Sequence, residues 1–467
     1  MEWVIAILLV APAAVLAGKR SSYLIDYAVF IFVLNRGIRR IVDFYINGYF
    51  NPLSPISLVP LVVTLLMGLA VFSNQNRLPK YIKGIAGLFL AAFAIAGALG
   101  FIATQFAVLY AGAEVVAPLF LLLYAVLLNP PMEVRDRWVR SFAWGAILVS
   151  AYGWYQYLVI PPWDAFWLKA TNMVGYMGIP KPTQMTVFST MGERGIVAGF
   201  LGYSVVPMIV SPKWRTKLGW LGVLLVFSVI LLTLSRGGII IAVVATAAFL
   251  IINKGAKMSQ VIVAAIVLAV GAFYGISKIP NSERIVERYQ KSVEDKSKDG
   301  SFEGRTQLMQ AGVGALLSRP LGYGLGAVGL ATRINTGDTK GSAKFADGGY
   351  FDILLTYGLP GTFLMLLALW RVWQQLKLRY RNPAYKTDHV LLARALMLSL
   401  FVTCFAGNFL NQFSILWLAM GTGLAVRAVG PTAGRGSRVA GNGKPGSLLA
   451  AGYAAAREEE GKERPES

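Results

Sequence analysis

The stretch from Lys217 to Asn253, KLGWLGVLLVFSVILLTLSRGGIIIAVVATAAFLIIN, decides the fold class of this chain. It contains two apolar runs, 217–235 and 236–253, that follow one another directly around a Ser-Arg-Gly-Gly sequence. A helix that crosses a bilayer needs about 20 mostly apolar residues, so each run is close to the required length. No soluble loop fits between the runs, and we therefore predict two membrane helices joined by a tight turn.

Apolar runs of this kind recur along most of the chain. Of the 467 residues, 56% are hydrophobic and only 14% are charged, whereas about a quarter of the residues in a soluble domain are charged. We therefore predict an all-α polytopic membrane protein with about 12–13 transmembrane helices. The thirteen candidate spans are 2–18, 22–40, 55–73, 82–102, 105–128, 138–160, 195–211, 217–235, 236–253, 259–278, 348–373, 390–407 and 413–427.

The formal net charge of +21 comes mainly from short basic clusters between the apolar runs. This placement is typical of cytoplasmic loops and argues against nucleic-acid binding. If the spans alternate, the clusters share one side, which we take as the cytoplasm, and the C-terminus lies there too. Thirteen spans put the N-terminus outside, and twelve put it inside. The clusters are Lys19-Arg20, Arg77/Lys80/Lys83, Arg135/Arg137/Arg140, Lys213/Arg215/Lys217, Lys254/Lys257 and 371–386.

The spans divide the chain into four predicted regions. Residues 1–278 form the first part of the bundle, and 348–428 form its C-terminal helices. Between them, 279–347 is a long external (periplasmic) loop between the tenth and eleventh spans, with short helices over 283–290 and 305–317. Loops of that length in compact proteins are usually functional or disordered. Residues 429–467 are rich in Gly, Ala and Ser and are predicted to form a disordered cytoplasmic tail.

Several kinds of chemistry have little support. The chain has one cysteine, Cys404, and one histidine, His389, so neither an intramolecular disulfide nor a histidine-rich metal site is expected. The external segments hold no DxD or paired-carboxylate motif for a divalent metal. No P-loop occurs, so the chain does not use ATP itself. We predict a protein without metal or cofactor.

Eight arginines fall on the external side or at its edge, where the positive-inside rule disfavours them. For any one of these arginines, contact with lipid headgroups or an ion pair is about as good an explanation as a functional role. The functional explanation is a phosphate-bearing ligand, because the planar guanidinium forms bidentate hydrogen bonds with phosphate oxygens. The eight are Arg36, Arg39, Arg40, Arg194, Arg236, Arg305, Arg319 and Arg333.

Arg236 is the strongest of these candidates because it stands between two apolar runs. A charge in that position is costly unless it faces a cavity or a partner. Gly237 and Gly238 would allow a tight turn or the close approach of a ligand. The alternative is an interfacial arginine whose side chain reaches up to the headgroups.

Three acidic residues are candidates for proton chemistry. Glu114 lies within a predicted span, which makes it a functional candidate by default, although pairing with an arginine of the bundle is at least as good an explanation. Asp347 stands at a predicted helix start, where it is either an N-cap or a general base. Asp352 is the reserve candidate for the base.

Several motifs together resemble the O-antigen ligase/polymerase superfamily. The resemblance is good over roughly 180–375, and the motifs are moderately specific together and weak singly. Arg305 opens the helical piece of the long loop and belongs to the same pattern. The motifs are Phe188-Ser-Thr-Met-Gly192 with Glu193-Arg194, Thr233-Leu-Ser-Arg-Gly-Gly238, Arg319-Pro-Leu-Gly-Tyr-Gly-Leu-Gly326, Asp347-Gly-Gly-Tyr-Phe351 and Tyr357-Gly-Leu-Pro-Gly361.

The resemblance implies a metal-independent glycosyltransferase that uses polyprenyl-diphosphate-linked glycans on the outer face of the plasma membrane. Arg236 and Arg305 match the two arginines of the family that hold the diphosphate. Asp347 is then the expected base, and the expected contacts to the diphosphate or glycan are Arg194, Arg319, Arg40 and Tyr350.

One departure separates the activities within the family. Ligases of the family usually carry a His-Asn pair where this chain has Asp347-Gly348, which favours a polysaccharide polymerase over an O-antigen ligase. A flippase for the same glycans is the alternative from another class. A transporter is expected to carry mid-membrane charges and often a repeat, whereas here Glu114 is the one strong mid-membrane charge and no repeat is evident. The bilayer, a chain-length regulator and a flippase are the partners expected besides the lipid-linked glycan.

Overall fold

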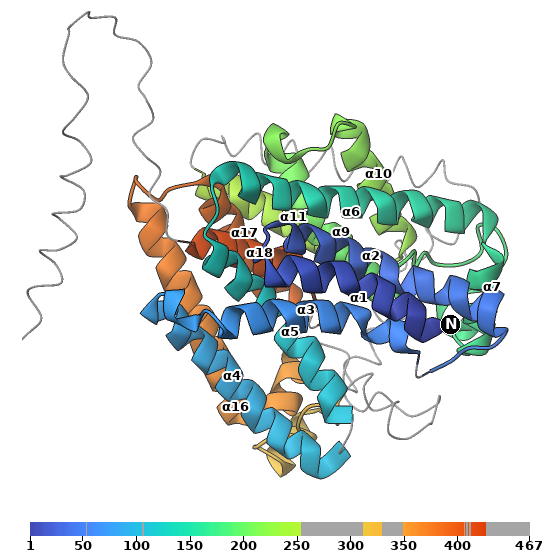
Figure 1. The fold of residues 1–467 in the computed structure, drawn as a ribbon, viewed down its shortest axis with the longest axis horizontal. Coiled ribbons are helices and arrows are strands. Elements are labelled where there is room, and N and C mark those ends of the chain that lie inside the picture. Colours follow the sequence, from blue (N-terminus) through green and yellow to red (C-terminus); the bar gives the residue numbers. More distant parts are fainter. Residues whose placement is uncertain are drawn as a thin grey trace, which may run out of the picture. The chain divides into compact units, whose positions relative to one another are not determined.

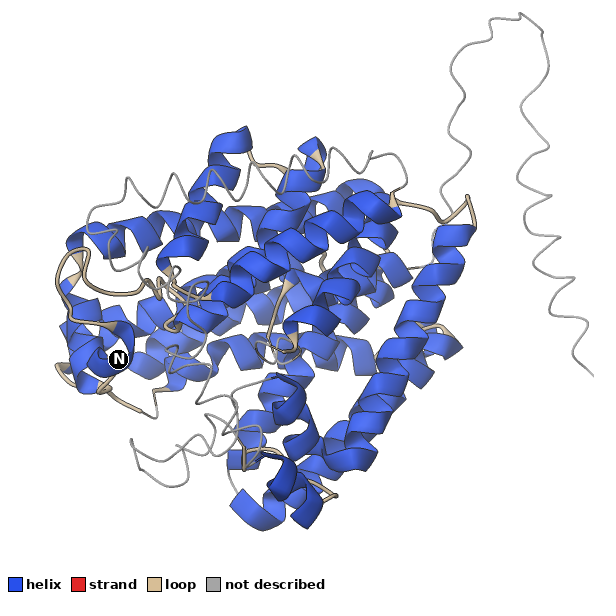
Figure 2. Cartoon of the chain, turned by 180° about the vertical axis from the view of Figure 1, so that it is seen from behind, coloured by secondary structure: helices blue, strands red, loops and turns tan. Residues whose placement is uncertain are grey.

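The computed structural model describes residues 1–52, 54–104, 107–253, 312–328, 349–405, 407, 410 and 412–425, which all belong to one compact unit, Met1–Ala428. In this part of the chain the regular structure is helical, and the only β-type pairing described is an isolated bridge between Gly178 and Met185 (Figure 2). The all-α prediction is confirmed. The candidate span 259–278, the helix predicted over 283–290 and the tail 429–467 lie outside the described residues.

Twelve of the thirteen candidate spans coincide with helices (Figure 1). The differences at the ends are a few residues, because helix ends depend on capping rather than on hydropathy. The helices are α1 (Glu2–Gly18), α2 (Tyr23–Val42), α3 (Val59–Phe72, preceded by the 3-10 turn Pro55–Leu58), α4 (Lys80–Thr104), α5 (Ala107–Leu128), α6 (Met132–Val159), α9 (Arg194–Val210), α10 (Gly219–Leu232), α11 (Arg236–Ile252), α16 (Gly349–Arg381), α17 (Asp388–Thr403) and α18 (Ile415–Leu424).

Two short helices, α7 (Pro162–Ala170) and α8 (Val174–Met177), lie between the candidate spans 138–160 and 195–211. Pro161 and Pro162 stand at the start of α7, where a fixed φ suits the first helical turn. Residues 312–318 are helical and end before Pro320, in agreement with the second helix predicted for the long loop.

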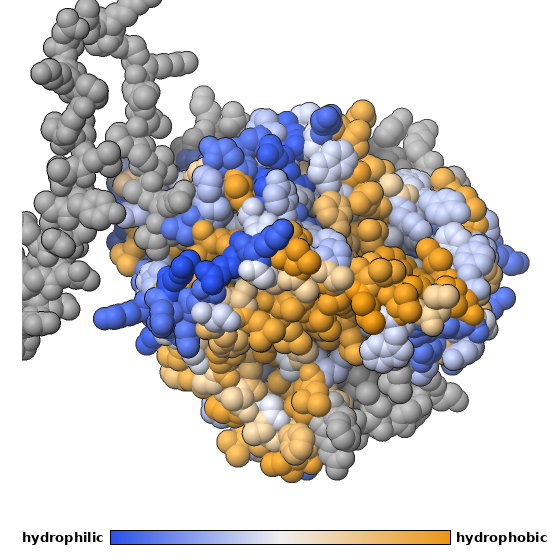
Figure 3. All heavy atoms as spheres, in the orientation of Figure 1, coloured by the Kyte–Doolittle hydropathy of each residue, from blue (hydrophilic) through white to orange (hydrophobic). Residues whose placement is uncertain are grey.

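The outer surface of the bundle suits a bilayer. Four helical segments are long and apolar enough to cross a membrane: Pro55–Phe72, α4, α5 and α16. Five others, α1, α9, α10, α11 and α18, are apolar but shorter. Figure 3 shows hydrophobic residues over much of one face, and the exposed large side chains include Ile7 and Leu8 of α1 and Leu69 and Phe72 of α3. The chain is a membrane protein built from helices.

Contacts between distant segments collect the basic clusters at one end of the bundle, here called the basic end. Arg137 of α6 pairs with Asp26 of α2 at 2.9 Å, and Lys213 pairs with Asp388 of α17 at 2.7 Å. The Tyr380 hydroxyl donates to the carbonyl of Ile252, which joins the ends of α16 and α11. The helices therefore bring their basic termini together, as alternating spans require.

The remaining helix termini meet at the opposite end, here called the outer end. Glu2 of α1 accepts a hydrogen bond from Asn51, which follows α2. The amide of Tyr350, at the start of α16, donates to the carbonyl of Cys404, beyond the end of α17, at 3.2 Å. α11 therefore ends at the basic end, and α16 starts at the outer end.

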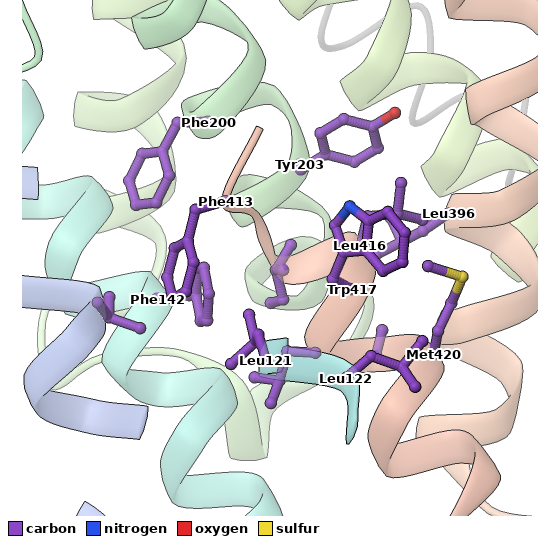
Figure 4. Packing of buried hydrophobic residues seen from close by; sticks show 14 of the residues in the cluster. Leu121, Leu122, Phe142, Phe200, Tyr203, Leu396, Phe413, Leu416, Trp417 and Met420 are labelled. Carbon is purple, nitrogen blue, oxygen red and sulfur yellow. The ribbon is translucent and has the colours of Figure 1, made fainter. Parts of the chain in front are cut away.

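The core lies where α2, α5, α6, α9, α17 and α18 meet (Figure 4). Phe413 stacks on Phe32 of α2 with 3.9 Å between ring centroids and lies against Phe142 of α6. Trp417 of α18 is buried, and its indole N–H donates to the carbonyl of Leu410 at 3.0 Å. This bonding removes the cost of an unpaired polar group in an apolar interior. α9, which begins at Arg194, is one of these core helices.

Candidate functional site

The turn between α10 and α11 places Arg236 at the first position of a helix. The Thr233 hydroxyl donates to the carbonyl of Ile230 at 2.6 Å and accepts from the amide of Ser235 at 3.3 Å. Leu234 has φ +52°, a left-handed conformation that a leucine rarely adopts. Arg236 is exposed. The chain therefore reverses within three residues, and the predicted tight turn is confirmed.

The glycines after Arg236 are explained by helix packing. A Cβ on Gly238 would lie 2.6 Å from the carbonyl oxygen of Ala198 in α9, and a Cβ on Gly202 would lie 2.6 Å from the carbonyl oxygen of Gly238. The backbones of α9 and α11 thus approach more closely than side chains allow, as small residues permit in membrane bundles. At Gly238, close contact between helices replaces the ligand approach that the sequence suggested.

Arg194 begins α9 beside the start of α11. The amide of Val187 donates to the carbonyl of Leu232 at 3.1 Å, which ties the segment before α9 to the end of α10. The Arg194 guanidinium carbon lies 3.9 Å from the centroid of the Tyr176 ring. Neither α9, with Glu193 as its N-cap, nor α11, with Ser235, has a side-chain cap hydrogen bond. Two helix N-termini, each with an arginine in its first position, therefore start at the outer end.

Arg36 and Glu114 lie close to the same segment. An Arg36 Nη1–H donates to the carbonyl of Met191 at 3.2 Å. Glu114, from α5, is hydrogen-bonded to Tyr110 and interacts electrostatically with Arg36 and with Glu193. The charge of Arg36 therefore acts on Glu114, and a direct ion pair between the two stays a prediction.

Arg40 is buried rather than open to a ligand. Its Nε lies 3.2 Å from Oδ1 of Asp164 in α7, and its Nη2–H donates to the carbonyl of Ser189. The ring centroid of Phe188 is 4.9 Å from the guanidinium carbon. Arg40 therefore holds α7 and the segment before α9 against α2. Its predicted contact with substrate stays a prediction.

Asp164 is a partner that the sequence did not reveal. Burial raises the pKa of its carboxyl, while Arg40 and hydrogen bonds from Gln156 and Tyr152 oppose that rise. Asp164 lies outside the thirteen candidate spans, and nothing in the sequence around it indicates a buried acid. Asp164 lies on the short helix α7, and the position of this helix brings its carboxylate to Arg40.

The Arg319–Gly326 segment is wedged between α4 and α16. The amide of Tyr323 donates to the carbonyl of Leu355 at 2.7 Å, and the amide of Leu325 donates to the carbonyl of Ala96 at 2.8 Å. Gly322, Gly324 and Gly326 have φ values of +88°, +89° and +82°, where glycine has no steric penalty. The guanidinium carbon of Arg319 lies 5.1 Å from the ring centroid of Tyr323.

The Arg319–Gly326 segment contacts a second family motif, Tyr357–Gly361 of α16. Gly358 interrupts α16 with φ +62°, and a Cβ there would lie 2.2 Å from the backbone of Leu321. A Cβ on Gly100 of α4 would lie 2.1 Å from the carbonyl oxygen of Leu325. The kink in α16 and the glycine at the end of α4 therefore make room for the Arg319–Gly326 segment.

Tyr350 stands on the first turn of α16, and its hydroxyl donates to the carbonyl of Phe401. Its ring meets Phe405 edge-to-face at 4.9 Å. Three predicted residues, Arg305, Arg333 and Asp347, lie outside the described residues. Within the described ranges no group of three His, Cys, Asp or Glu side chains is placed to hold a metal ion.

The family comparison bears on this part of the chain. Residues 221–366 match the O-antigen ligase family. The match confirms the resemblance to the O-antigen ligase/polymerase superfamily, and the matched O-antigen ligase region includes Arg236, the Arg319–Gly326 segment and the first part of α16. No curated protein and no solved structure gave a match.

Proposed function

We propose that this membrane protein of the O-antigen ligase/polymerase type is a glycosyltransferase that polymerises polyprenyl-diphosphate-linked repeat units at the outer face of the bacterial plasma membrane. The observation that carries the proposal is the pair of helix starts at the outer end, where Arg194 opens α9 and Arg236 opens α11. The unpaired N–H groups of a helix start and the dipole of the helix both favour a phosphate. Two such starts with two guanidinium groups suit a diphosphate.

The reaction follows from that arrangement. A hydroxyl of the acceptor sugar attacks the anomeric carbon of the lipid-linked donor, the new C–O bond forms, and the bond to the diphosphate breaks with inversion. Negative charge grows on the diphosphate as it leaves. Guanidinium groups already in place stabilise that charge, and one such donor contributes about 3 kcal/mol. No metal ion is needed when arginines supply the positive charge.

The attacking hydroxyl must lose its proton to a base. We assign this role to Asp347, with Asp352 as the reserve, and a base in position contributes about 100-fold or more. Arg305 joins Arg236 at the diphosphate in this proposal. Arg319, Tyr350 and Arg40 are proposed as further contacts to the diphosphate or glycan.

The second candidate is the ligase reaction, in which the glycan passes to lipid A-core or to a protein. The description of the matched family favours it. Against it stands Asp347-Gly348, at the position where ligases of the family usually carry a His-Asn pair. Both reactions use the same leaving group and therefore the same arginines.

The test replaces the proposed diphosphate ligands one at a time. We expect Arg236→Ala and Arg305→Ala to lower the rate of chain extension at least 100-fold, because one lost donor of about 3 kcal/mol corresponds to that factor. Arg140→Ala is the matched control, since Arg140 is an exposed arginine of α6 near the basic end. The assay combines purified full-length protein with lipid-linked repeat units in the presence of EDTA, which removes divalent metal ions. The products are separated on gels.

Wild-type product ladders from both outer-end variants would refute the diphosphate role. Activity that disappears in EDTA and returns with Mg²⁺ would refute metal independence. Deletion of the gene separates the two candidates. Single repeat units left on the lipid indicate a polymerase, and long chains stranded on the lipid indicate a ligase.

A further inference from the structure

A groove lies at the basic end, far along the chain from the motifs of the glycan site. It is lined by Tyr81 at the start of α4 and, at and beyond the end of α16, by Gln375, Leu378, Arg379, Asn382 and Tyr385. Arg379 donates from Nη2 to the Tyr81 hydroxyl at 2.7 Å and from Nη1 to the carbonyl of Ala425 at 3.0 Å. The rings of Tyr81 and Tyr385 lie 5.7 Å and 5.8 Å from its guanidinium carbon. Its position is thus defined by four contacts.

The third nitrogen of this guanidinium, Nε, is different from the two that donate. The Nε of Arg379 is buried and has no hydrogen-bond partner among the described residues. A buried donor without a partner carries a desolvation penalty. The Arg379 guanidinium also has no ion pair with a carboxylate among the described residues, and an anion in the groove is the best match for its positive charge.

The cations around the groove have no carboxylate partners among the described residues. Two other cations at this end have carboxylate partners: Lys213 lies near Asp136 and Asp388, and Arg137 pairs with Asp26. Residues 75–84 and 371–386 contain no Asp or Glu, and within the described ranges no ion pair joins their cations to a carboxylate. These cations are Arg77, Lys80, Lys83, Arg371, Lys377, Arg379, Arg381 and Lys386.

An apolar surface continues from the groove along α16. Leu378 lines the groove and is 57% exposed, and Trp370, two turns earlier, is also 57% exposed. Leu366 and Phe363 are exposed farther along the same helix. A ligand with a charged head and hydrocarbon chains would satisfy both the groove and this surface.

We propose that the groove binds the phosphate headgroup of an anionic phospholipid, with its acyl chains along the exposed side of α16. The positive-inside rule explains the number of cations here, but it explains neither the groove nor the unpaired Nε. Basic pockets between helices on the cytoplasmic side are suited to such headgroups. The site is at the opposite end from the proposed glycan site and does not depend on the glycan chemistry.

The test measures retention of phosphatidylglycerol by the purified full-length protein. Asn382→Asp adds a negative charge to the groove and keeps the oxygen that accepts from the amide of Ala384 at 3.0 Å. Arg379→Gln removes the central cation. Lys217→Gln is the control, because it removes one exposed cation at the same end but outside the groove. Bound lipid is counted by native mass spectrometry during titration with phosphatidylglycerol or phosphatidylcholine.

We expect both groove variants to bind phosphatidylglycerol about 5- to 10-fold more weakly, since each lipid-facing charge contributes about 1 kcal/mol. The control should bind like the wild type, and phosphatidylcholine should bind weakly to all four proteins. Equal retention of phosphatidylglycerol by all four would overturn the proposal, as would equal retention of the two lipids. Displacement by millimolar inorganic phosphate would reassign the groove to free phosphate. If Arg379→Gln does not fold, Asn382→Asp still decides the question.

Discussion

Arginines at the outer end fall into two physical groups. Arg40 is 1% exposed and paired with the fully buried Asp164, whereas Arg236 is exposed at the start of α11. A buried guanidinium that already has a carboxylate and two aromatic rings as neighbours stabilises the fold around it. Arg236 instead stands at the surface, at the start of a helix. Both are arginines at the outer edge of an apolar run, so the sequence pattern treats them alike.

We expect Asp164→Ala to destabilise the protein by about 3–5 kcal/mol, because it leaves the Arg40 charge buried without its partner. The matched control is Asp388→Ala, whose pair with Lys213 is 46% and 38% exposed. An exposed pair of that kind contributes at most about 1 kcal/mol. Chemical unfolding of the purified protein in detergent measures both. Equal losses for the two variants would contradict a structural role for the Arg40–Asp164 pair.

Among the helices, glycine contacts determine how α4, α16 and the Arg319–Gly326 segment fit together. Gly100 and Gly358 meet the backbone of that segment from two sides, and the glycines within the segment take left-handed conformations. Side chains larger than hydrogen would hold these backbones apart. The contacts orient Arg319, which the sequence offers as a ligand residue without indicating what positions it.

Gly100→Ala tests that fit, with Gly97→Ala as its control. A Cβ on Gly97, one turn earlier in α4, would meet nothing within 4 Å, whereas one on Gly100 would clash with the carbonyl oxygen of Leu325. Alanine in a helix raises the free energy of unfolding by about 0.5–1 kcal/mol relative to glycine, so Gly97→Ala should be neutral or stabilising. We expect Gly100→Ala to lower the unfolding midpoint and the rate of glycan transfer. Equal behaviour of the two variants would show that neither stability nor glycan transfer depends on the close contact between α4 and the Arg319–Gly326 segment.

For the whole molecule, the segregation of charge predicts orientation in the membrane. The basic clusters meet at one end through contacts such as Lys213 with Asp388, and the outer end carries Tyr49 and α7. Because basic loops stay in the cytoplasm, the outer end should face away from it. The proposed chemistry needs that orientation, since the lipid-linked donor is used on the outer face.

Single-cysteine labelling of intact spheroplasts checks the orientation. The sole native cysteine, Cys404, is 4% exposed and is replaced by alanine. We expect Tyr49→Cys to react with a membrane-impermeant maleimide at once, because Tyr49 is 62% exposed at the outer end. Lys217→Cys should react only after the membrane is permeabilised. The reverse pattern would invert the topology and remove the substrate from the proposed site.

Sequence patterns were sufficient to predict the helical class, twelve of the candidate spans and the turn at Arg236. Hydropathy is a local property, and a bilayer requires each span to satisfy its own backbone hydrogen bonds, so span positions can be recognised one at a time. The family motifs likewise pointed to Arg236 and Arg319 without any knowledge of packing.

Other features depend on contacts between residues far apart in the chain. The burial of Arg40 against Asp164, the meeting of Gly100 and Gly358 at the Arg319–Gly326 segment, and the groove around Arg379 each join helices separated by many residues. Packing between helices decides which of several similar arginines is buried, which is open and which lacks an acceptor. Composition and spacing do not encode those distances, because they arise only when the helices are in place.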